Sequence, residues 1–216
     1  MTKPVNTLFS RFKAVSLIVS CWMALHVLAA DTISLRGGKL DWTGDLASGW
    51  VGGTAEQIER VMTRSDNAAL TAIMQEMLLD AQVLDIYFTH LDVTGIGTRT
   101  LSTLRSNVME RSFQLDNDSD RAAMWSAFAD LQQSEAPETA TVSLAGSSTL
   151  AVGGQVGYEA VFRTDYPDGG TVYEAVVLVN LNSNLSQIFK LRADGNKFTA
   201  RYEEFRNMLA TVKYNL

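Results

Sequence analysis

The sequence predicts an α+β protein in which an antiparallel β-sheet is flanked by helices and closed by a C-terminal amphipathic helix packed on the sheet. Residues 171–181 are rich in β-branched and aromatic types and almost continuously apolar after Glu174, which is typical of a strand covered on both faces. Farther along, apolar residues recur at intervals of four, three, four and three, the spacing of one helical face. These residues are Phe198, Tyr202, Phe205, Leu209 and Val212. Each contributes roughly 1.5–3 kcal/mol when fully buried, so we expect the helix to lie on the sheet.

Two more strands are expected beside the central one, in a three-stranded meander. Apolar and polar residues alternate between positions 158 and 163, and residues 166–170 contain a proline and two glycines that favour a hairpin turn. A second turn at 182–184 leads into a strand at 185–192.

Upstream of this meander, the pattern predicts two short strands at 139–144 and 149–152, separated by 146–148. The adjacent glycines Gly153 and Gly154 indicate a bend or bulge before the meander. Together these elements form a C-terminal sheet and helix block over residues 139–216.

The first 30 residues have the layout of a cleaved signal peptide. Lys3, Arg11 and Lys13 precede an uncharged apolar run that ends in small residues, so cleavage is expected after Ala29 or Ala30. The run is shorter than the ~20 apolar residues that a spanning helix needs, so no stable membrane span is expected after cleavage. Lipid attachment at Cys21 is a less favoured alternative, because the apolar run continues well past that cysteine.

The composition of the exported part restricts its partners and its chemistry. Removal of the signal peptide leaves 15 basic against 24 acidic side chains, a net charge of −9, which argues against nucleic acid or an anionic membrane surface as partner. The only cysteine leaves with the signal peptide, so the domain must be stable without disulfides. The remaining residues, 31–216, suffice for one sizeable core, and we expect a single domain.

The N-terminal half predicts helices followed by a strand. Thr54 and Gln57 fit a capping box at the start of one helix, and a second helix is expected from Ser65 and Asp66. In residues 83–91, apolar positions ending at His90 alternate with polar ones, as in a strand with one buried face.

The middle of the chain leaves alternatives open. Within residues 95–115, the spacing of Leu101, Leu104 and Val108 favours a helix, whereas 107–115 also fits a strand.

An acidic cluster follows at residues 116–120. It resembles the start of a calcium loop but lacks the required glycine, and Ala127 stands where glutamate is needed, so we expect a turn. In that turn Ser119 or Asp120 caps a helix over 121–133. The side chains expected to face inward are Met124, Phe128 and Leu131.

The chemical inventory gives no catalytic, cofactor-binding or metal-binding residue to nominate. After cleavage His90 is the only histidine and no cysteine remains, which excludes the common zinc sites and a cysteine nucleophile. A serine triad would have to use His90 with Asp92 or Asp85, and no spacing distinguishes paired catalytic carboxylates from surface acids.

Two tryptophans near the mature N-terminus invite two interpretations. Trp42 and Trp50 lie among glycines, and we expect them to cap the core, because aromatic side chains supply large buried areas. The alternative is a ligand-stacking surface.

The C-terminal block resembles PsbP-like and DcrB-like proteins over residues 139–214. The similarity lies in residues 142–146 and 154–158, the hairpin at 166–170, the strand at 172–181 and the closing helix with Phe198 and Phe205. The resemblance implies an antiparallel sheet with helices on it and a last helix whose phenylalanines pack on the sheet. It also implies an exported or lipid-anchored accessory protein that binds other proteins, with no catalytic residues to transfer.

These observations together predict a periplasmic, non-catalytic accessory protein whose partner is another protein of the cell envelope. The alternatives are a secreted hydrolase using His90 or paired carboxylates, and a small-ligand-binding domain using Trp42 and Trp50.

Overall fold

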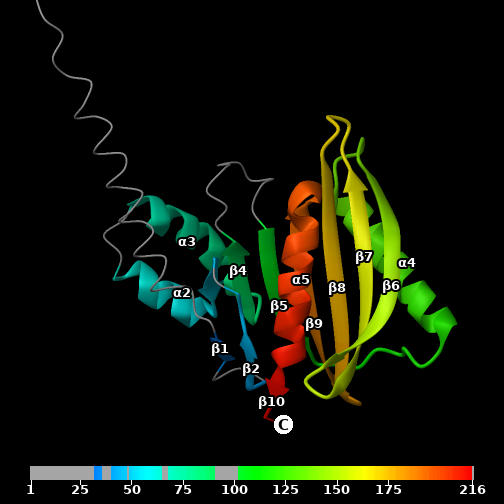
Figure 1. Ribbon diagram of the computed structural model, residues 1–216, viewed down its shortest axis with the longest axis horizontal. Coiled ribbons are helices and arrows are strands. Elements are labelled where there is room, and N and C mark those ends of the chain that lie inside the picture. The colour runs from blue at the N-terminus through cyan, green and yellow to red at the C-terminus, as the bar shows by residue number, and fades with distance from the viewer. Residues whose placement is uncertain (1–31, 36–39, 48, 65–67, 91–101, 216) are drawn as a thin grey trace, which may run out of the picture.

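The computed structural model describes residues 32–35, 40–47, 49–64, 68–90 and 102–215 (Figure 1). The expected signal peptide with Cys21, the helix start at Ser65 and Asp66, and Asp92 lie outside the described residues.

Seven antiparallel strands form the main sheet, in the spatial order β3-β4-β5-β9-β8-β7-β6. In chain order they are β3 (Trp50–Gly53), β4 (Ile86–His90), β5 (Ser102–Met109), β6 (Thr141–Val152), β7 (Gln155–Asp165), β8 (Thr171–Asn182) and β9 (Leu185–Asp194). A second sheet, ordered β1-β2-β10, joins the described N-terminal strands β1 (Thr32–Leu35) and β2 (Trp42–Asp45) to the C-terminal β10 (Lys213–Tyr214).

The three-stranded C-terminal meander is confirmed, and β6 extends it to four strands. β6, β7, β8 and β9 pair in succession. The prediction of two short strands before the meander is wrong: β6 is one strand of 12 residues, with a register shift between Leu144 and Gly146. Gly153 and Gly154, with φ of 57° and 79°, make the two-residue turn into β7, a conformation that suits glycine.

The middle segment, for which helix and strand were both left open, contains a strand, and the helical alternative is wrong for its described part. β5 spans Ser102–Met109 and pairs with β4 and β9. The alternation of apolar and polar residues expected of a strand is obscured in the sequence, because two polar residues, Ser102 and Ser106, share the buried face with Leu104. Ser106 Oγ accepts a hydrogen bond from the buried Gln187 Nε2 at 2.8 Å, which accommodates its polarity in the core.

Four helices cover the described sheet: α2 (Ala55–Met62), α3 (Ala68–Ala81), α4 (Asp118–Glu135) and α5 (Gly195–Thr211). Figure 1 shows α5 across one face, with α4 partly hidden behind β6 and β7. The burial pattern places α2 and α3 on the α4 side: Trp50 and Phe88 belong to the same cluster as Phe205 of α5, whereas Val51 packs with Ile58 of α2. One face therefore carries α5, and the other carries α4 and the α2–α3 pair.

The helix starts follow local capping chemistry. At α2 the predicted capping box is present, with Thr54 Oγ1 accepting from Gln57 N and Gln57 Oε1 accepting from Thr54 N. At α4 the cap is Asn117, not Ser119 or Asp120, because its side chain accepts from Asp120 N at 2.8 Å.

The inward face of α4 differs from the prediction in two residues. Trp125 is buried, packing edge-on against Phe162 of β7, whereas Leu131 is 51% exposed. Met124 and Phe128 are partly buried. The inward face is therefore centred on Trp125 and shifted away from Leu131.

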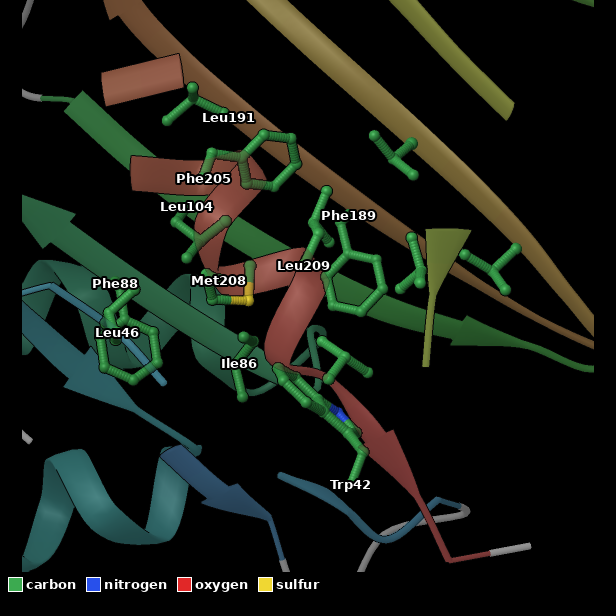
Figure 2. Packing of buried hydrophobic residues seen from close by; sticks show 14 of the residues in the cluster. Trp42, Leu46, Ile86, Phe88, Leu104, Phe189, Leu191, Phe205, Met208 and Leu209 are labelled. Atoms are coloured by element: carbon green, nitrogen blue, oxygen red, sulfur yellow. The ribbon is translucent and has the colours of Figure 1, made fainter. Parts of the chain in front are cut away.

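The largest core cluster lies between the sheet and α5 (Figure 2). Phe205, Met208 and Leu209 of α5 are at most 1% exposed, and Trp42 meets Phe189 edge-on at 5.4 Å. The predicted packing of the C-terminal helix on the sheet is thus confirmed. No helix among the described residues has the length and apolar character needed to cross a membrane.

Candidate functional site

The two tryptophans are structural. Trp42 is fully buried and Trp50 is 1% exposed. The Trp50 ring also donates a hydrogen bond from Nε1 to Glu204 Oε2 of α5 at 2.9 Å. Their burial confirms the core-capping interpretation and removes the basis of a ligand-stacking surface.

His90 is packed in the fold at the end of β4. It is 8% exposed, and its ring meets Trp50 edge-on at 5.3 Å. Gly49 lies so close that a Cβ there would come within 2.5 Å of His90 Nε2. Asp85 directly precedes β4, whereas His90 is the last residue of that strand, so the two side chains lie at opposite ends of it. The described surroundings of His90 therefore do not support the hydrolase alternative.

Among the described residues one carboxylate is buried, and its contacts join three elements. Glu159 of β7 accepts hydrogen bonds from Ser148 Oγ of β6 at 2.7 Å and Tyr202 Oη of α5 at 2.8 Å. Arg206 Nη1 of α5 lies 3.5 Å from the same Glu159 oxygen. Burial, and then the bond to Glu159, raise the pKa of Tyr202 above its ordinary value. We define these four residues as the Glu159 clasp, which fastens α5 to the sheet.

The described residues bring no three histidine, cysteine, aspartate or glutamate side chains together as a metal site requires. A cavity of about 660 Å³ lies where the β7–β8 turn meets the start of α5. Its lining comes from the turn, from β8 and from the start of α5, and includes two carboxylates, Asp168 and Asp194. This lining alone does not assign a chemical role to the cavity.

The two edges of the main sheet differ sharply. β3 has four residues and is contacted by α2 and α3. β6 has 12 residues with no charged residue and no proline, and residues 143–149 are all exposed. Only the start of this edge is bonded to α4, where Gln133 Oε1 accepts from Val142 N and Gln133 Nε2 donates to Ala140 O. From Gly146 to Val152 the strand keeps one register with β7, which leaves a regular outer edge.

A groove runs on the α4 side of the sheet, over β5 and β9, between α4 and Leu84 in the segment that joins α3 to β4. Its volume is about 310 Å³. Six apolar side chains line it: Leu84, Met109, Phe113, Phe128, Leu131 and Ile188. Its polar lining comprises Arg105, Ser106, Asn107, Arg111 and Lys190. The groove is thus apolar in its body and basic in its charge.

The basic residues of the groove are placed against one another. Arg105 of β5 and Lys190 of β9 are direct cross-strand partners, an arrangement that destabilises a sheet when the charges are alike. Lys190 Nζ lies 3.6 Å from Glu174 Oε1, while the Arg105 and Arg111 guanidinium groups lie over the rings of Tyr87 and Phe113. Among the described carboxylates, none forms an ion pair with either arginine.

Sequence reasoning singled out neither surface. The uncharged run of β6 was visible in the sequence, but its position at the sheet edge was not. The groove residues come from strands and helices far apart in the chain and alternate with buried neighbours, so no local signal connects them.

Comparison with known proteins yields a structural similarity without a sequence match. Neither the protein-family models nor the curated proteins searched contain a match to this chain. Among solved structures, cyanobacterial PsbP (CyanoP) from Synechocystis sp. PCC 6803 superimposes with a TM-score of 0.52 at 14% identity, covering 86% of this chain and 93% of CyanoP. LpqN, involved in cell envelope biogenesis of Mycobacterium tuberculosis, gives a TM-score of 0.44 at 11% identity, covering 85% of this chain and 90% of LpqN.

At 14% identity the similarity to CyanoP concerns the fold and not the activity. The similarity covers 86% of this chain, a larger share than the C-terminal block of residues 139–214. The chain therefore has a PsbP-like fold.

Proposed function

We propose that this chain is an exported, non-catalytic accessory protein of the cell envelope that binds a partner protein by adding a strand of the partner to β6. The observation that carries the proposal is the long, uncharged and exposed edge of β6. Exposed edges of this kind are usually blunted by charges, proline, short length or a covering element, because their free backbone groups pair with other chains.

Three features support strand addition at residues 146–152. The register with β7 is regular there, so the outward backbone groups repeat at strand spacing. The bulge before Gly146 and the bonds from Gln133 act only on the first part of β6. In strand addition, main-chain hydrogen bonds supply affinity and alternate side chains supply specificity.

The test is a crosslinking pull-down from the cell envelope with three baits: the wild-type protein, Ser147→Lys and Thr199→Lys. Ser147 is exposed near the start of the edge segment 146–152, and a lysine there disfavours edge pairing. Thr199 is exposed on α5 and provides the matched control. We expect one partner to be captured by the wild type and by Thr199→Lys and to be lost with Ser147→Lys. Equal capture by all three, or capture of only a second copy of this chain, would contradict the proposal.

Export is tested separately by the mass of the protein recovered from the envelope. A signal peptidase cut after Ala29 or Ala30 predicts a chain that begins at Ala30 or Asp31 and is unaffected by Cys21→Ser. A lipid-modified chain beginning at Cys21, or a chain that keeps residue 1, would show that the signal-peptide interpretation is wrong.

A further inference from the structure

The groove over β5 and β9 has a composition that points to a particular kind of ligand. Its apolar side chains come from α4, from strands β5 and β9 and from the segments next to β4 and β5. Its three basic side chains are Arg105, Arg111 and Lys190. Pockets for small molecules are mostly apolar with a few convergent polar groups and begin at about 300 Å³, and this groove is about 310 Å³.

The basic side chains are concentrated in a protein that is acidic overall. The chain has 18 basic against 24 acidic residues, yet three bases and no acid line this groove. Arg105 and Lys190 are direct cross-strand partners, and Glu174 lies 3.6 Å from Lys190 while no described carboxylate pairs with Arg105, so an anion between the two bases supplies Arg105 with a charged partner.

The apolar part of the lining is equally informative. Leu131 is 51% exposed although α4 offers a core beneath it, and Ile188 beside it is 8% exposed on the groove floor. Phe128 carries Lys190 Nζ over its ring at 5.6 Å, so the apolar and basic surfaces are continuous. A ligand that fits both must have an anionic head and an apolar body.

We propose that this groove binds a single-chain amphiphilic anion, with its carboxylate or phosphate between Arg105 and Lys190 and its hydrocarbon chain along Ile188, Phe128 and Leu131. This site lies on a face of the sheet and is separate from the β6 edge. The proposal therefore goes beyond the proposed function and fails independently of it.

The experiment measures binding of dodecanoate, dodecanol and dodecylammonium to the purified protein by calorimetry and by NMR chemical-shift perturbation, below their micelle concentrations. We expect dodecanoate to bind most tightly, and Arg105→Gln and Lys190→Gln each to weaken it about tenfold, because each removes a charge-assisted contact. Arg163→Gln is the matched control, since Arg163 is exposed on the α5 side of the same sheet. It should leave binding unchanged.

Leu131→Asp gives a second test that does not depend on removing a base. A carboxylate at this exposed position should weaken the binding of dodecanoate and strengthen the binding of dodecylammonium. Equal binding of dodecanoate and dodecanol, no binding of dodecanoate, or equal effects of Arg105→Gln and Arg163→Gln would overturn the proposal. Two further probes separate the sources of the anion. If inorganic phosphate competes as well as dodecanoate, or if only phosphatidylglycerol vesicles bind, the amphiphile site is likewise refuted.

Discussion

The face of the sheet under α5 is packed by one continuous cluster, whereas the opposite face is covered by two separate groups of helices with a groove between them. Under α5, Phe205, Met208 and Leu209 are buried against the strands, and the Glu159 clasp fixes the helix at its side. On the other face, Trp125 and Ile58 belong to different clusters, and Leu131 is left half exposed. The difference teaches that the face under α5 closes the core while the opposite face leaves a groove, so substitutions on the two faces should differ in their effect on stability.

The largest effect is expected from Phe205→Asp on the closed face. Removing a buried phenylalanine costs about 3–5 kcal/mol, and a buried carboxylate adds to the loss, which is a large share of the roughly 5–15 kcal/mol that stabilises a typical domain. Urea unfolding should show a chain that is unfolded or destabilised by about 4 kcal/mol or more. Asn207→Asp, exposed on the same helix, adds the same charge and should unfold near the wild-type midpoint. Equal midpoints for the two variants would show that α5 is not the closing helix.

A smaller effect on the same face is expected from Glu159→Gln. The amide keeps the shape of the side chain but removes the charge from the group that accepts hydrogen bonds from Ser148 and Tyr202. Hydrogen bonds to charged groups contribute about 1.5–3 kcal/mol each, and the amide retains part of this, so we expect the free energy of unfolding to fall by about 1–3 kcal/mol. Glu203→Gln, an exposed position of α5, is the control in the same urea experiment. If both variants match the wild type, the clasp does not hold the helix.

High pH should weaken the closed face through its tyrosines. Burial raises the pKa values of Tyr202 and Tyr214 above the ordinary 10.0. Above pH about 10 the unfolded chain therefore loses these protons before the folded chain does, and the free energy of unfolding falls as the pH rises further. Tyr214→Phe should reduce this fall, as measured by urea unfolding between pH 8 and about pH 11. An unchanged slope in the variant would refute the assignment to Tyr214.

The smallest stability effect is expected from Leu131→Asp in the groove. Substitutions at exposed positions usually change the free energy of unfolding by no more than about 0.5 kcal/mol. The variant should match the wild type in urea while its preference between anionic and cationic amphiphiles changes. A loss comparable with that of Phe205→Asp would mean that Leu131 belongs to the core and that the two faces do not differ.

The parts of the fold that could be predicted are those specified by neighbouring residues. The capping box of Thr54 and Gln57, the doubly covered strand β8 and the stripe of α5 each depend on local spacing. β5 was missed because buried Ser102 and Ser106 interrupt its alternation, and Ser106 is accommodated by Gln187, 81 residues away. That partner is set by the sheet order and cannot be read from the strand itself.

The groove was beyond sequence reasoning for the same reason. Arg105 and Lys190 face each other only because β5 pairs with β9, which joins segments more than 80 positions apart. Leu131 is half exposed because the face of α4 that packs on the sheet is centred on Trp125. The spacing of Met124, Phe128 and Leu131 predicted a different inward face. Trp42 and Trp50 were correctly expected in the core, because large aromatic side chains supply more buried area than any other residues there.

The most direct test of the account is amide hydrogen exchange in the complex with the partner captured by the wild-type protein. Pairing of a partner strand with the bare edge predicts slowed exchange within residues 146–152 of β6 and unchanged exchange in β3 at the opposite edge. Unchanged exchange in β6 in a complex that is otherwise stable would contradict strand addition as the way this protein binds.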